Sequence, residues 1–318
     1  MKRMSLSLLV FLFAVSSEAQ IKKTYQRVKQ AVTGSAKISQ LHYFPSQWEV
    51  DLALGFRYSS LSLNGKSTGL TVLEADQSIS ILTTSLTLGV LDNVYAQLKW
   101  DYMINFNLEY SKPDTQPSSK SKGSENPAIA GVVRVVDGGS VKLDGKIEIS
   151  PSTGDHLEAD ATHDGDAKSG GHTTTIGGRF VVLVTGSSQL GFGLDYTVFS
   201  LERSRDQSSG QISESAKHNQ TTIEISTLTE ITSDLFFGLM LDIVNVDSYK
   251  STDLTSLSTT DYGSTSGKTI NLIGKYEVTP DSSISAEVGY IIDYSTNIGS
   301  LDVSASGYSM ATNYLVRF

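Results

Sequence analysis

The stretch VYAQLKWDYMINFNLEY, residues 94–110, decides the fold, because its residues alternate in polarity with a period of two. Only a β-strand places successive side chains on opposite faces in this way. An ordinary strand has about five or six residues, so this one is long enough to cross a bilayer at a tilt and project beyond it. The residues of its apolar face are Val94, Ala96, Leu98, Trp100, Tyr102, Ile104, Phe106, Leu108 and Tyr110.

The same alternation recurs along the chain, for example in WEVDLALGFRY (48–58), LFFGLMLDI (235–243) and SISAEVGYIIDY (283–294). Turn residues such as Asn, Asp, Gly, Pro and Ser separate the alternating stretches. The pattern predicts twelve strands: 47–59, 70–89, 94–110, 127–136, 141–152, 172–186, 189–203, 218–231, 235–249, 267–279, 283–295 and 303–318.

The connections between these strands alternate in length. Five are tight turns near residues 91, 137, 186, 232 and 280. The other six are longer and polar: 60–69, 111–126, 153–171, 204–217, 250–266 and 296–302. Short turns on one side and long loops on the other are typical of outer-membrane barrels. We therefore expect an all-β fold, a single transmembrane antiparallel β-barrel of about 12 strands over residues 47–318. A secreted soluble β-sandwich, which also alternates, is the main alternative.

Composition excludes several other classes of function. Of the 318 residues, 39% are hydrophobic, and the net charge of −9 argues against a nucleic-acid partner, which would need a concentrated basic face. The sequence has no cysteine, so it can have neither a disulfide framework nor a thiol nucleophile.

The first residues predict export. Lys2 and Arg3 precede an apolar stretch from Leu6 to Val15, and the small residues Ser17 and Ala19 follow. This pattern predicts a signal peptide over residues 1–19, cleaved before Gln20. A retained helical anchor is the alternative, but the apolar stretch is short for crossing a membrane.

Residues 20–46 precede the first predicted strand and have two possible interpretations. They carry five basic residues and no acidic one, and Ile21, Tyr25, Val28 and Val32 would share one face of a helix. The segment is either a periplasmic tail, which we favour, or a basic helix that enters the barrel as a plug.

The last strand predicts how the barrel is assembled. It closes the barrel against the first strand, and it ends on an aromatic residue preceded by alternating bulky residues. This ending resembles the C-terminal recognition signal of bacterial outer-membrane barrels, which implies the barrel assembly machinery as a partner and outer-membrane lipid as the surroundings. The residues that carry this assembly signal are Tyr308, Tyr314, Val316 and Phe318.

Two short motifs carry a resemblance to a family. GVLDNVYAQLKWDY from Gly89 and KIEISPSTGDH from Lys146 resemble stretches of the outer-membrane family known as meta-pathway phenol-degradation-like. In the second stretch, Ser152 stands between Pro151 and Thr153 of a Pro-x-Thr-Gly-Asp-type sequence. The resemblance implies a channel for small hydrophobic or aromatic compounds.

The face opposite the apolar one carries charges, which cannot face hydrocarbon, because an Arg or Lys near the bilayer midplane costs about 2–4 kcal/mol. These residues must line water inside the barrel or pair across it. A hydrophobic solute would need an apolar path, so this polar lining disagrees with the family resemblance. The predicted pore-lining residues are Lys99, Asp101, Arg134, Lys146, Arg179, Asp195, Glu224 and Asp242.

The sequence offers little for catalysis, and we expect no enzyme, no cofactor and no metal site. None of the five histidines is followed two places later by the serine that barrel lipases pair with histidine. The loop GDHLEADATHDGDAK contains His156 and His163 among several acids, but it lacks the spacing of a calcium loop. We interpret it as a solvated external loop.

The sequence therefore predicts an outer-membrane channel for the passive diffusion of small solutes. Two alternatives remain open. One is a non-conducting structural or surface-binding barrel, whose interior would be closed by ion pairs. The other is a barrel hydrolase, whose activity would depend on His156 or His163.

Overall fold

The computed structural model describes residues 40–41, 43–112, 118–158, 163–168, 170–207 and 209–318, and all regular structure within them is β-strand. No helix among these residues is long and apolar enough to cross a membrane. The predicted signal peptide and most of the predicted tail or plug lie outside the described residues.

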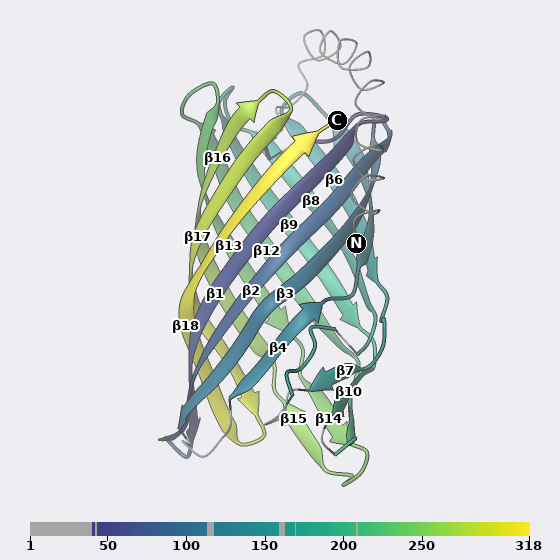
Figure 1. The fold of residues 1–318 in the computed structure, drawn as a ribbon. Helices are drawn as coiled ribbons and strands as arrows, with labels where there is room; N and C mark the ends of the chain where they lie inside the picture. Colours follow the sequence, from purple (N-terminus) through teal and green to yellow (C-terminus); the bar gives the residue numbers. More distant parts are fainter. Residues whose placement is uncertain (1–39, 42, 113–117, 159–162, 169, 208) are drawn as a thin grey trace, which may run out of the picture.

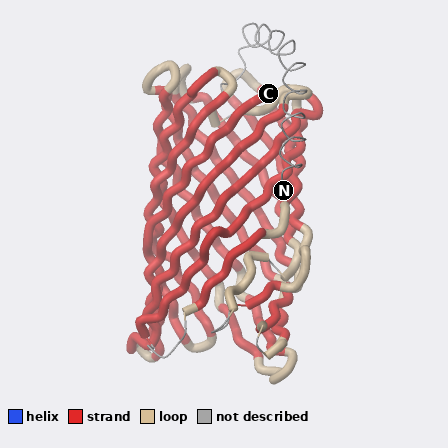
Figure 2. Tube along the Cα trace, viewed as in Figure 1, coloured by secondary structure: helices blue, strands red, loops and turns tan. Residues whose placement is uncertain are grey.

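Twelve long strands form a closed antiparallel barrel (Figures 1 and 2). Each pairs with the next, and β18 pairs with β1 from Asp51↔Arg317 to Lys66↔Asp302, so the sheet has no free edge. The strands are β1 (Val50–Ser67), β2 (Leu70–Leu91), β3 (Val94–Lys112), β5 (Ala128–Asp137), β6 (Val141–Ser150), β8 (Thr173–Leu183), β9 (Ser188–Phe199), β12 (His218–Glu230), β13 (Leu235–Val246), β16 (Thr265–Thr279), β17 (Ser282–Ile298) and β18 (Leu301–Arg317). The expected 12-stranded barrel is confirmed.

Six shorter strands gather at the end of the barrel opposite the C-terminus (Figure 1). We call this the loop end, and the end with the C-terminus and the five tight turns the turn end. The short strands extend the wall where β5, β6, β8, β9, β12 and β13 stop early. They are β4 (Ser119–Ser124), β7 (His156–Glu158), β10 (Glu202–Asp206), β11 (Ile212–Ser215), β14 (Tyr249–Asp253) and β15 (Thr259–Tyr262).

Two of the six predicted loops are wrong over almost their whole length, and the other four contain the short strands. The segments 60–69 and 296–302 are almost entirely strand, and the chain reverses within two-residue turns at Thr68–Gly69 and Gly299–Ser300. Thr68, Gly69 and Gly299 have positive φ, which a tight hairpin requires. These strand ends are polar on their outward face, so their sequence resembles that of a loop.

The outside of the barrel carries an apolar belt. Outward side chains near the turn end of the long strands are large, apolar and exposed, as in Leu86, Leu98 and Val288. Tyrosines lie at its border toward the loop end, where the rings of Tyr58 and Tyr308 are 6.0 Å apart. An apolar belt bordered by aromatic residues is the surface of a barrel that sits in a lipid bilayer.

The strands from β16 through β18 and β1 to β3 continue beyond this belt toward the loop end. There the polarity of their outward and inward faces is reversed. Outward positions become polar, including Ser62, whose hydroxyl donates to Asp76 at 2.7 Å. Inward positions become apolar, and Ala75, Val303 and Ala305 are buried. The barrel therefore has two storeys, a membrane storey at the turn end and an outer storey at the loop end.

A β-bulge makes part of this change. Ser80 pairs with Asn105 and Ile81 with Met103, so Ile104 is one extra residue in β3. An extra residue transfers the following side chains to the other face. Phe106, Leu108 and Tyr110, which the sequence analysis placed on the outward face with Trp100, therefore point inward. That prediction was wrong, because the sequence alternates without interruption through the bulge, which therefore cannot be recognised from the pattern.

The belt predicts how stability depends on depth. We expect Leu98→Arg to lower the free energy of unfolding by about 2–4 kcal/mol, because it places a cation in hydrocarbon. The matched control Ser62→Arg, outward but in the outer storey, should change it by less than about 0.5 kcal/mol. Guanidinium unfolding of the barrel in lipid vesicles measures both. Equal losses for the two variants would contradict this placement of the belt.

Candidate channel lining

Two ion pairs on the inner wall reach across an intervening strand. Lys146 of β6 contacts Asp195 of β9 at 2.7 Å, although β8 lies between them. The residue of β8 between them is Gly177, where an added Cβ would lie 1.8 Å from the Asp195 carboxylate. A concave wall brings such side chains together, and the glycine leaves the space between them.

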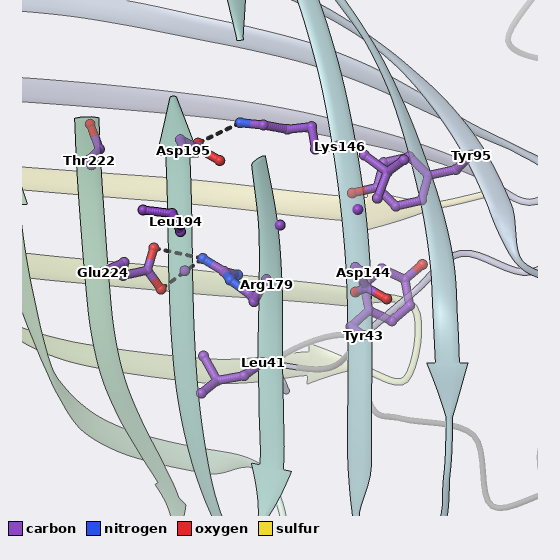
Figure 3. Close-up of a pocket in the computed structure, with 14 residues that line it drawn as sticks. Leu41, Tyr43, Tyr95, Asp144, Lys146, Arg179, Leu194, Asp195, Thr222 and Glu224 are labelled. Carbon is purple, nitrogen blue, oxygen red and sulfur yellow. Dashed lines mark hydrogen bonds and ion pairs between the residues drawn. The ribbon is translucent and has the colours of Figure 1, made fainter. Parts of the chain in front are cut away.

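The second pair repeats this arrangement one strand further on. The Arg179 guanidinium of β8 donates to both carboxylate oxygens of Glu224 in β12, at 2.7 and 2.8 Å. The residue between them in β9 is Gly193. Figure 3 shows both pairs on neighbouring strands. Three of these four side chains are less than about two-fifths exposed, and Arg179 is 41% exposed.

The other predicted lining residues are also partnered along this wall. Arg134 contacts Asp144 at 2.8 Å, Lys99 contacts Asp101 at 2.7 Å, and Asp242 accepts a hydrogen bond from Asn271 at 2.9 Å. We call these residues, together with the two long pairs, the charged belt. Four of its cations are paired with acids, whereas Asp242 is bonded to the neutral Asn271. That these residues line a pore stays a prediction.

The charged belt borders a cavity of about 230 Å³ near the turn end. Its wall combines the charged side chains with Tyr95 and Val132, and two residues that precede β1, Leu41 and Tyr43, complete it (Figure 3). A short peptide segment thus enters the barrel and narrows it beside the charged belt.

This segment, Leu41 and Tyr43–Ser46, lies across the turn end, and we call it the strap. The Leu41 amide donates to Gln189 of β9 at 2.8 Å, and the Phe44 ring lies 4.8 Å from the Tyr95 ring of β3. Ser46 packs on the backbone of Gly89, where an added Cβ would lie 1.8 Å from the Ser46 carbonyl oxygen. Because β9 lies six strands from β1 in the ring, the strap joins opposite walls.

The strap is fastened where β1 meets β18. The Tyr43 hydroxyl donates to Asp51 at 2.8 Å and accepts from Arg317 at 3.1 Å, while Arg317 also contacts Glu49 at 2.9 Å. Burial, and then the Asp51 carboxylate, raise the pKa of the Tyr43 hydroxyl well above its usual range. Tyr43 therefore keeps the proton that it donates.

The inner wall of the outer storey is chemically different. A cavity of about 440 Å³ there is lined by Met103, Phe106 and Leu108 on one side and by His156 and Asp166 on another. On another part of the wall the aromatic rings of Phe199, His218, Tyr249 and Tyr262 form a continuous stack with centroid spacings of 4.3–4.8 Å. The interior thus gains apolar and aromatic surface toward the loop end.

Sequence reasoning missed three parts of this lining. The strap was missed because Leu41, Tyr43 and Phe44 follow no strand period. The inward turn of Phe106 and Leu108 depends on a single bulge. The glycines opposite the long ion pairs were the detectable signal, since Gly177 and Gly193 occupy inward positions in otherwise regular strands.

The histidines near this wall have partners among the described residues. No group of three or more His, Asp or Glu side chains in that part of the chain could hold a metal ion. His156 is paired with Asp166, and His218 lies in the aromatic stack. The proposed assembly signal, Tyr308, Tyr314, Val316 and Phe318, lies on the outward side of β18 rather than on this wall.

Comparisons with known proteins identify the fold. No family model and no curated protein matches the sequence. The structure is similar to that of an outer-membrane channel from Pseudomonas putida F1, with a TM-score of 0.60 and 10% identity over 89% of this chain and 100% of that chain. It is also similar to the translocator domain of the autotransporter NalP from Neisseria meningitidis, with a TM-score of 0.54 and 12% identity over 95% and 98% of the two chains. The chain therefore has the fold of outer-membrane barrels.

The long ion pairs predict how single charges control the interior. Lys146→Met should leave Asp195 unpaired and shift ion selectivity toward cations, whereas Asp195→Asn should leave Lys146 unpaired and shift it toward anions. The double variant should return toward the original selectivity. Reversal potentials of single channels in a salt gradient measure all three, and shifts of the same sign for both single variants would contradict this pairing.

Proposed function

We propose that this protein is an outer-membrane channel through which small solutes diffuse passively. The observation that carries the proposal is the closed barrel with an apolar belt outside and a charged, hydrogen-bonding wall inside. Such a wall is compatible with water and with dissolved solutes, and the belt suits a bilayer. The turn end faces the periplasm, as in barrels whose short turns lie on that side.

The channel is narrow. A 12-stranded barrel lies between small barrels filled by side chains and the wide 16-stranded porins. In this chain the charged belt and the strap both reduce the free cross-section near the turn end. Small molecules with little charge are therefore the solutes that the interior favours.

Two observations support small hydrophobic or aromatic solutes in particular. The outer storey provides the apolar surface that the sequence analysis missed, in Phe106, Leu108 and the aromatic stack. The motif resemblance to a family of channels for such compounds points the same way. A solute would meet the apolar wall first and the charged belt second.

The barrel assembly machinery is the proposed partner during biogenesis, with Tyr308, Tyr314, Val316 and Phe318 as the recognition signal.

A second function, a non-conducting structural barrel, is favoured by the pairing within the charged belt. A barrel held shut by ion pairs would be silent in an electrical recording, so conductance separates the two functions.

The decisive experiment is conductance of the refolded protein in a planar bilayer. We expect discrete, steady steps whose size is well below that of wide porins, because the interior is narrow. The control is heat-modifiable migration on a gel, which shows that the preparation is folded. A folded but silent barrel, together with vesicles that remain impermeable to small neutral solutes, would overturn the channel in favour of a structural barrel.

The strap predicts a change in conductance. The variant Tyr43→Ala, Phe44→Ala removes the two rings that cross the turn end, and we expect it to raise single-channel conductance about twofold or more, because the narrowest part widens. Deleting residues 22–40 tests the plug interpretation of the preceding residues separately. A rise only in the deletion variant would show that those residues, and not the strap, limit the flow.

A further inference from the structure

The cavity of about 440 Å³ in the outer storey combines an apolar wall with polar side chains. The apolar side is Met103, Phe106 and Leu108 from β3, and the polar side includes His156 and Glu158 from β7. In Figure 1, β7 lies near the loop end, and β3 runs along the barrel wall to that end. Ligand sites commonly have this composition, with a few convergent polar groups on a largely apolar surface.

The orientation of His156 is fixed by Asp166. The Nδ1 atom of His156 lies 2.9 Å from Oδ1 of Asp166, and the backbone amides of Leu157 and Lys168 donate to the same oxygen at 3.0 and 3.3 Å. A carboxylate so placed accepts the Nδ1 proton, which selects the tautomer of the neutral ring. The Nε2 atom of His156 is then an acceptor.

The other oxygen of the Asp166 carboxylate is closed off from the cavity. The Oδ2 atom of Asp166 is buried, and no donor among the residues that the structure describes reaches it. Nor does any of those residues donate to Nε2 of His156. Nε2 of His156 is therefore the acceptor that this cavity offers to a donor group of an occupant.

The charge of the cavity limits the occupant further. Asp166 and Glu158 are both acidic, and Glu158 accepts a hydrogen bond from the Ser204 hydroxyl. None of the described residues that line the cavity is Lys or Arg. An anionic ligand would be repelled, whereas an uncharged hydroxyl group could donate without introducing a charge.

We propose that this cavity binds a small uncharged molecule with an apolar body and a hydroxyl donor. The body packs against Met103, Phe106 and Leu108, and the hydroxyl donates to Nε2 of His156. That this cavity is the first binding site on the path of a solute through the barrel rests on the proposed channel function. The binding itself does not. His156 then sets the specificity for a hydroxyl, and Asp166 positions it.

The test is equilibrium dialysis of the solubilised full-length barrel against three probes that share one ring system. These are 1-naphthol, which carries the donor; 1-methoxynaphthalene, which lacks it; and 1-naphthoate, which is anionic. We expect 1-naphthol to bind about three- to tenfold more tightly than the methoxy compound, the range of one hydrogen bond. The anion should bind more weakly than both.

Three variants locate the binding. His156→Leu should abolish the preference for 1-naphthol over the methoxy compound and leave the latter's binding nearly unchanged. Phe106→Ser should weaken binding of both, because it removes the apolar wall. The control His172→Leu alters an exposed histidine elsewhere near the loop end and should change neither. Heat-modifiable migration checks that each variant is folded.

Two results would overturn the proposal: equal affinity of the original protein for 1-naphthol and the methoxy compound, or an unchanged preference in His156→Leu. Conductance of the same preparations separates this failure from that of the channel. Specific binding by a silent barrel would overturn only the channel, and conductance without the preference would overturn only the binding site.

Discussion

Backbone hydrogen bonding inside a bilayer is the constraint on which the rest of this structure depends. Hydrocarbon offers no partner to a free amide or carbonyl group, and each unpaired group costs several kcal/mol. A sheet meets this requirement only by closing, as β1 and β18 do here along nearly their full length. Closure then gives every strand one face toward lipid and one face toward the interior. The direction of each side chain therefore decides whether it contacts lipid or lines the interior.

The interior uses its curvature to neutralise charge. On a concave wall, Lys146 and Arg179 can contact acids two strands away, provided that the residue between is small, and Gly177 and Gly193 meet that condition. Because these side chains are partly exposed, each pair contributes only on the order of 1 kcal/mol or less to stability. Their main effect is therefore electrostatic, since each pair neutralises two charges of the interior wall.

The sequence was sufficient for the fold, because the period of two and the turn residues mark all twelve long strands and their order. It was insufficient wherever one residue changes the side that its neighbours face. Ile104 is such a residue, and its bulge turns Phe106 and Leu108 from the outside to the inside. The strap was also beyond reach, since Tyr43 and Phe44 are held by contacts with β1, β3, β5 and β18 that no local pattern encodes. The partners of Lys146 and Arg179 depended on the register of three strands each.

The reversed polarity of the two storeys also fixes how deeply the barrel can sit in the membrane. Sinking it by one outward repeat, two residues or about 7 Å along a strand, would bring the hydroxyls of Ser60, Ser78 and Ser306 into hydrocarbon, where groups of this kind are costly. Raising it by the same step would expose the apolar residues beside the turn end to water. The pattern of apolar and polar outward residues therefore fixes the depth of the barrel in the bilayer. When the bilayer thickness changes, the lipid must adapt, because the protein cannot shift along the membrane normal.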